Sequence, residues 1–190
     1  LGYQWADNCF HLSYGMIDLR NDKGEVGKMK SREGTVVDAD DLVAEVVQKA
    51  KDMATERGHI EGMSDTEKGN LFQMIGLGGL KYYLLKVAPG KRMTFNPEES
   101  VDLNGNTGPF IQYVHARISS LLRKSDEIKP LSENATLFPI ESEIIQQLAQ
   151  YPEVVKTAGS DYSPAVIANY VYELAKSYNS FFQNISVNRE

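Results

Sequence analysis

The chain has 190 residues, 42% of them hydrophobic and 24% charged, with a formal net charge of −6. This composition is ordinary for a folded cytosolic protein and allows one domain or two small ones. The negative balance argues against indiscriminate binding of nucleic acid, and no apolar run approaches the ~20 residues of a membrane span. No signal peptide is evident and the first residue is not methionine, so we expect a piece of a longer cytoplasmic protein.

The single cysteine, Cys9, cannot form a disulfide within the chain, and no metal-ligand spacing surrounds it or the three histidines. We therefore expect no metal site. We also expect Cys9 to be a small buried residue in a reducing compartment.

The first expected elements are a short helix or loop around Trp5 and a strand within the alternating run 12–19. A basic segment enclosed by glycines follows. Its cations Lys28, Lys30 and Arg32 fall within five residues, which suits a polyanion. A solvated turn is the plainer interpretation of the composition alone.

Two helices with clear start signals come next. Asp38 suits the N-cap of the first, and Ser64 begins a capping box with Glu67 for the second. The second helix runs into the glycine-rich segment 76–79. This segment indicates either close backbone packing or a break before another helix over 80–87.

The second half of the chain is expected to be a helical bundle. A turn-rich segment marks the domain boundary, which we place between residues 103 and 104. The expected bundle elements are helices at 109–124 and 140–148, a helical turn at 152–157, and a last helix beginning at Pro164. His115 falls on an apolar stripe of the first of these helices and is expected in the core.

Charge is unevenly distributed along the chain. From Lys81 to Lys124 there are seven cations and three anions, whereas the flanks are acidic. A local basic band suits a structured RNA bound at one face. The charge pattern alone does not outweigh a merely solvated face.

The order of residues in the basic segment resembles a family signature. Gly27-Lys28-Met29-Lys30-Ser31-Arg32, followed by Gly34-Thr35-Val36-Val37 and a helix with Asp40-Asp41-Leu42, resembles the second signature of class I aminoacyl-tRNA synthetases, most closely that of arginyl-tRNA synthetases. The resemblance implies a loop that closes over ATP, with its cations on the phosphates while the amino acid carboxylate attacks the α-phosphorus.

The catalytic residues implied by this resemblance are Lys28, Lys30, Ser31 and Arg32, and the ATP-binding loop as a whole is Gly27, Lys28, Met29, Lys30, Ser31 and Arg32. The cation and the hydroxyl exchange places relative to the usual family order. Whether Lys30 or Arg32 faces the pyrophosphate therefore stays open.

Three later stretches are similar to the same family. Residues 76–85 are similar to its connecting helices, 104–117 to the entry into its DALR-type anticodon-binding bundle, and 168–176 to a later helix of that bundle. The first class I signature, His-x-Gly-His, is absent. The resemblance implies a mainly α fold, in which residues 1–103 end a nucleotide-binding α/β catalytic domain and residues 104–190 form a truncated helical anticodon-binding bundle.

The resemblance implies an arginine–tRNA ligase, which activates arginine with ATP and Mg²⁺ and transfers it to tRNA(Arg). We expect this fragment to be inactive alone and to hold no cofactor. The parent is expected to be a cytoplasmic monomer with no membrane or DNA partner. Two alternatives stay open: a free-standing helical RNA-binding module without catalysis, and a purely structural interaction domain.

Contacts with tRNA are predicted on two bundle helices. Tyr113 and Arg117 are four residues apart and share a helix face, where an aromatic plane and a guanidinium suit base stacking and phosphate contact. The other predicted tRNA-binding residues lie on the last helix and are two amides that suit base edges and two rings that suit stacking: Asn169, Asn179, Tyr172 and Phe182.

Overall fold

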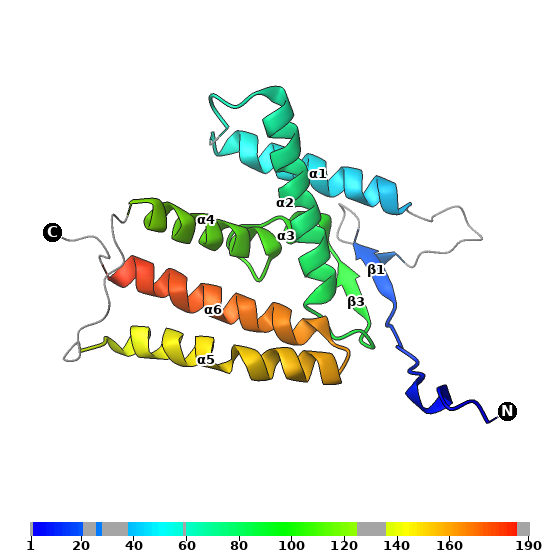
Figure 1. Cartoon of the computed structure of the whole chain (residues 1–190). Helices are drawn as coiled ribbons and strands as arrows, with labels where there is room; N and C mark the ends of the chain where they lie inside the picture. Colours follow the sequence, from blue (N-terminus) through cyan, green and yellow to red (C-terminus); the bar gives the residue numbers. More distant parts are fainter. Residues whose placement is uncertain (1, 21–25, 28–37, 59, 125–135, 186–190) are drawn as a thin grey trace.

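Helices dominate the computed structural model, and its strands form only a small sheet at one side (Figure 1). The structure describes residues 2–20, 26–27, 38–58, 60–124 and 136–185. The predicted loop residues Lys28, Met29, Lys30, Ser31 and Arg32 lie outside these ranges. The mainly α fold expected from the sequence is confirmed.

The sheet contains three short strands in the order β2-β1-β3. The central strand β1 (Ile17–Arg20) pairs antiparallel with β2 (Val26–Gly27) and parallel with β3 (Met93–Phe95). Before the sheet, the chain forms a 3-10 helix, η1 (Ala6–Asn8), and an extended segment. The strand is therefore shorter than the alternating run that predicted it.

Two long helices pack against this sheet, and their ends follow the capping signals. In α1 (Ala39–Glu56), the Asp38 carboxylate accepts a bond of 2.9 Å from the Asp40 amide. In α2 (Asp65–Leu85), Ser64 and Glu67 form the reciprocal capping box. Gly58, at φ +71°, takes the left-handed conformation that follows the end of α1.

The glycine-rich segment lies inside α2, which continues unbroken through it. A Cβ at Gly76 would meet the backbone of Val46 and Val47 on α1, and one at Gly79 would meet the carbonyl of Ser100. Close backbone packing is therefore the correct interpretation of these glycines. The helix expected separately over 80–87 is the C-terminal part of α2.

The main hydrophobic core lies where α1 and α2 cover the sheet. Val46, Leu80 and Phe95 form its buried centre, and Leu19 and Tyr83 pack around it. The Tyr83 ring meets the Phe95 ring edge-on, with centroids 5.1 Å apart. This core packs β1 and β3, which are more than 70 residues apart in the sequence, against α1 and α2.

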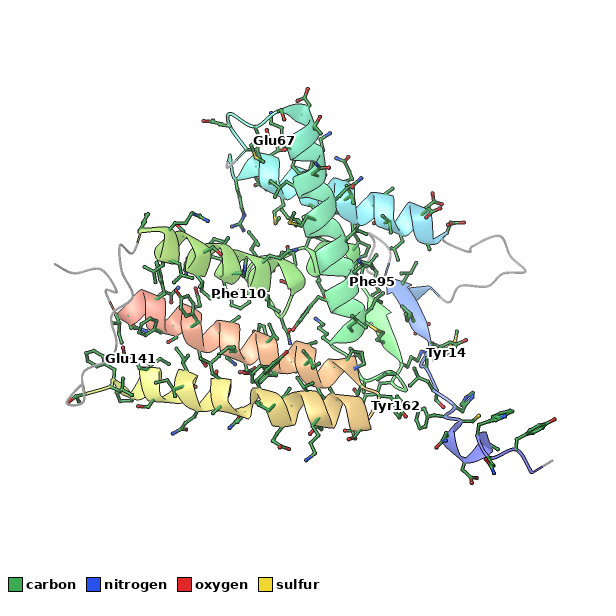
Figure 2. The ribbon with its side chains drawn as sticks, in the orientation of Figure 1. Tyr14, Glu67, Phe95, Phe110, Glu141 and Tyr162 are labelled. Atoms are coloured by element: carbon green, nitrogen blue, oxygen red, sulfur yellow. The ribbon has the colours of Figure 1, made fainter. Side chains whose placement is uncertain are left out.

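A short helix, α3 (Pro97–Ser100), leads into three long helices that form the bundle: α4 (Gly108–Lys124), α5 (Pro139–Ser160) and α6 (Pro164–Asn184). Helix α6 lies between α4 and α5 (Figure 1). Figure 2 shows Phe110 between α4 and α6, where its ring centroid lies 5.6 Å from that of Tyr172. None of the described helices combines the length and hydropathy needed to cross a membrane.

Helix α5 is one element, although the sequence predicted a helix and a separate turn. Pro152 lies inside it. Proline removes one backbone hydrogen bond and normally breaks a helix. Here contacts with α6 hold the chain close to this position, because Tyr170 donates to the carbonyl of Gln147 at 3.0 Å and its ring lies 5.8 Å from that of Tyr151.

Two expectations about burial are wrong. His115 is exposed, because the side chain that faces inward at this level of α4 is its neighbour Val114, which is 2% exposed and lies about 100° away around the helix. Cys9 is also exposed. It follows η1 in an N-terminal segment that contacts the rest of the described structure at few points.

The packing at Gly76 predicts a large penalty for a single methyl group. Gly76→Ala would force the Cβ to within 2.9 Å of the α1 backbone, so we expect a loss of about 1–3 kcal/mol in the free energy of unfolding. Gly69→Ala, in the same helix with nothing within 4 Å, should instead add about 0.5–1 kcal/mol. Thermal unfolding followed by circular dichroism measures both, and equal effects would contradict the packing explanation.

Candidate functional site

The predicted phosphate loop is anchored at two described positions. Gly27 ends β2 opposite Leu19 of β1, and Asp38 caps α1. The intervening cations lie outside the described residues. The structure therefore locates the supports of this loop, namely the edge of the small sheet and the N-terminus of α1.

The small sheet contains a two-pronged ion pair that the sequence did not predict. Arg92 donates from Nε to Asp18 Oδ2 at 2.6 Å and from Nη2 to Asp18 Oδ1 at 2.9 Å. Asp18 is only 4% exposed, and its hydrogen bonds raise the pKa of Arg92 above its usual range. The pair links β1 to the residue before β3, because bidentate geometry favours one fixed arrangement. A separation of 74 residues left no sequence signal for it.

Four of the six predicted tRNA-binding residues meet at one place between α4 and α6, which we call the Arg117 cluster: Tyr113, Arg117, Asn179 and Phe182. Arg117 Nη2 donates to the Tyr113 hydroxyl at 2.5 Å, and Nη1 donates to Asn179 Oδ1. The guanidinium carbon lies 4.7 Å from the Tyr113 ring centroid and 4.6 Å from that of Phe182. The two rings therefore hold the guanidinium between the helices.

The charge of Arg117 is not neutralised within the described structure. It contacts a phenol, an amide and two rings, and no described carboxylate forms an ion pair with it. Tyr113 is 46% exposed, so the cluster opens to solvent on that side. A fixed guanidinium beside an exposed aromatic ring suits a phosphate next to an unstacked base.

The remaining two predicted residues lie nearer the start of α6. The Asn169 side-chain amide donates to the carbonyls of Lys86 at 3.0 Å and Ala165 at 2.8 Å. Tyr172 is half-buried against Phe110. Asn169 and Phe182 are thirteen residues apart, or about 20 Å along the helix. The structure therefore separates the six residues into one cluster and two distant positions.

The basic band predicted from the sequence is partly engaged inside the molecule. Arg92 bonds Asp18, Lys86 donates to the carbonyl of Asn106 at 2.9 Å, and Arg117 belongs to its own cluster. Burial lowers the pKa of Lys86. These three cations do not form one continuous basic face.

An apolar cavity of about 580 Å³ adjoins the Arg117 cluster, and sequence reasoning missed it. Its walls come from α1, α2 and α4, including Met53, Met74 and Ile111, and Tyr113 belongs both to the wall and to the cluster. Met74 of α2 is 63% exposed. No group of three or more metal-ligand side chains occurs among the described residues.

Comparison with protein families assigns the two halves of the chain. The model for the catalytic domain of class I tRNA synthetases (R) matches residues 1–96, and the model for the DALR anticodon binding domain matches residues 111–190. Both matches occur in one chain, which favours a synthetase over a free-standing RNA-binding module.

Individual proteins agree with this assignment. The chain is 54% identical to an arginine–tRNA ligase of Flavobacterium psychrophilum over 98% of its length, and 50% identical to that of Bacteroides fragilis over all of it. It covers 30% and 32% of these relatives, respectively. Arginyl-tRNA synthetase of Thermus thermophilus has a similar fold over 94% of the chain, with a TM-score of 0.78 at 28% identity. The matched region is 28% of that protein's length.

A synthetase of Plasmodium falciparum shares the fold over 81% of the chain, with a TM-score of 0.70 at 22% identity. The chain spans about a third of the length of the Flavobacterium and Bacteroides relatives. Two family models in order, and relatives similar over the whole chain, place it in the arginyl-tRNA synthetase family of class I aminoacyl-tRNA synthetases.

Proposed function

We propose that the protein containing this chain is an arginine–tRNA ligase, which activates arginine with ATP and transfers it to tRNA(Arg). The observation that carries the proposal is identity of about 50% to arginine–tRNA ligases along the whole chain. The chain contributes a phosphate loop and an anticodon-binding bundle. The domain boundary is proposed at residues 103 and 104, between the ranges that match the two family models.

The loop acts by neutralising charge. Lys28, with Lys30 or Arg32, meets the phosphates of ATP and its Mg²⁺, and Ser31 supplies a hydroxyl. Such contacts accelerate the reaction only where they are stronger in the transition state, as pyrophosphate charge develops. The positions that flank the loop support this role, because Gly27 pairs with β1 and Asp38 caps α1. The Asp18–Arg92 pair ties β1, the strand paired with Gly27, to the chain before β3.

The bundle binds the anticodon arm through the Arg117 cluster. Tyr113 and Phe182 offer rings for stacking, and Asn179 orients the guanidinium; Tyr172 and Asn169 are predicted contacts farther along α6. From residue 126 to the end of the sequence there are nine acidic and four basic residues. Such a surface favours recognition by shape and stacking over many phosphate contacts.

The remaining proposals come from the family. The parent is a monomer, acts in the cytoplasm, and needs neither membrane nor DNA. The arginine pocket and the adenine site lie outside this chain, so the chain alone is inactive.

The first prediction is that the isolated chain does not activate arginine. ATP–pyrophosphate exchange with arginine, measured with tRNA present, should equal a blank without protein. The full-length protein should exchange under the same conditions. Exchange by the isolated chain would show that the parts outside it are not required.

Lys28→Ala in the full-length protein should lower the rate of activation about 100-fold with little change in the Michaelis constant for arginine, because the lost contact forms mainly in the transition state. Lys51→Ala, at an exposed lysine on α1, is the matched control and should retain the parental rate. A change confined to the Michaelis constant for arginine would contradict the role assigned to the loop.

Phe182→Ala in the full-length protein should weaken tRNA binding by about 1–3 kcal/mol, the value of one stacked base, and leave adenylate formation unchanged. Tyr151→Ala, which removes an aromatic side chain 50% exposed on α5, should bind tRNA like the parent. Filter binding with cognate and non-cognate tRNA measures both variants.

Salt dependence separates stacking from bulk charge. If one guanidinium and a few rings carry the contact, log K should fall with log salt with a slope of about 1–2, since each neutralised phosphate adds a little under one unit. A steep slope with equal affinity for cognate and non-cognate tRNA would show that charge, not the Arg117 cluster, does the binding.

A further inference from the structure

The C-terminal end of α2 is hydrogen-bonded to the bundle through side chains that the proposed catalysis and tRNA binding leave unused. The Tyr82 hydroxyl donates to Asn106 Oδ1 at 2.5 Å and to the Ala168 carbonyl of α6 at 3.2 Å. Four residues later, at the C-cap of α2, Lys86 Nζ donates to the carbonyl of Asn106 at 2.9 Å. These bonds join residues 20 to 86 positions apart in the sequence.

In this seam, the phenol of Tyr82 keeps the hydrogen that its bonds require. Burial raises the pKa of Tyr82 to about 12, so its phenol keeps its hydrogen at neutral pH, and the two acceptors share that hydrogen. The ammonium of Lys86 also lies 4.1 Å from the Tyr83 ring centroid. All three side chains are half-buried, where bonds are shielded from competing water.

A second contact crosses the same boundary at a separate place. The ring of Phe10, from the N-terminal segment, stacks on Tyr162 with centroids 4.2 Å apart. Tyr162 lies in the turn between α5 and α6 (Figure 2) and has φ +49°, unlike any other described residue except glycine. This stacking adds a second contact between residues 1–103 and the bundle, beside the hydrogen bonds of Tyr82 and Lys86.

We propose that Tyr82 and Lys86, with Asn106 and the Ala168 carbonyl, form a clamp that sets the orientation of the bundle relative to the catalytic part. These are positioning residues, and the inference rests on the proposed function. A tRNA held at the Arg117 cluster must also place its acceptor end in the catalytic site. The clamp limits the orientations of the bundle. It therefore raises the effective concentration of the tRNA acceptor end at the catalytic site.

The direct test removes the hydrogen-bonding groups and keeps the side-chain bulk. Tyr82→Phe and the double variant Tyr82→Phe with Lys86→Met are prepared in the full-length protein. Tyr83→Phe is the matched control, since the Tyr83 hydroxyl bonds Thr94 and Glu99 within the catalytic part. Asn169 is left intact, because it is itself a predicted tRNA contact and its loss would confuse contact with orientation.

We expect kcat/KM for whole tRNA(Arg) to fall about fivefold for Tyr82→Phe and about 20-fold for the double variant, since one net hydrogen bond is worth about fivefold in an equilibrium. The KM values for ATP and arginine should match the parent. The dissociation constant of an RNA hairpin that reproduces only the anticodon arm should also match. Tyr83→Phe should retain the parental kcat/KM.

A second measurement does not depend on activity. Spin labels on Glu45→Cys of α1 and Gln150→Cys of α5, both exposed positions, report the distance between the catalytic part and the bundle. The exposed Cys9 is replaced by serine, as are other reactive cysteines of the full-length protein. The distance distribution should be broader in the double variant than in the parent and in Tyr83→Phe.

Three results would overturn the clamp: a parental kcat/KM for tRNA in the double variant, an unchanged distance distribution, or an equal loss of hairpin binding, which would show that the bundle itself is disturbed. A parent that fails to charge tRNA(Arg) would instead refute the proposed function. In that case the distance distributions still decide whether the seam sets the orientation.

Discussion

The close approach of backbones around α2 is the constraint on which the rest of this structure depends. Gly76 lets α1 lie against α2, and Gly79 lets Ser100, the last residue of α3, approach α2. Gly78 lies against Gln112 and Gly108 of α4. One helix thus contacts the sheet side and the bundle side through positions that lack a Cβ. Because backbone cannot yield as a flexible side chain can, these crossings fix where α4 begins, and α4 in turn presents Arg117.

The Arg117 cluster shows how an acidic bundle keeps a usable cation. Neutral partners hold the guanidinium: a phenol, an amide and two aromatic rings. A carboxylate in the same place would have oriented Arg117 equally well but cancelled its charge, as Asp18 does for Arg92. The two arginines therefore have different uses that follow from their partners. Arg92 connects strands, whereas Arg117 keeps a charge that no described carboxylate neutralises.

Local signals in the sequence predicted the elements well, and long-range contacts explain the differences. Asp38 and the Ser64–Glu67 box marked helix starts because capping needs only neighbouring residues. Pro152 and the glycines of α2 were ambiguous because tertiary packing decides whether a helix continues through them. Tyr113 and Phe182 were each predicted as tRNA contacts, but nothing local shows that they hold the same guanidinium. Periodicity also misplaced His115, since one residue of register separates it from buried Val114.

Helix α6 connects the proposed clamp to the Arg117 cluster. Ala168 and Asn169, near its start, bond the end of α2, and Asn179 and Phe182, near its end, belong to the Arg117 cluster. The separation of these sites is about 20 Å along a continuous helix. A change of about 10° at the seam would displace the cluster by about 3 Å over that length, which is the scale on which a reactive group is in or out of position. The hydrogen bonds at the start of α6 therefore influence the position of the Arg117 cluster near its end.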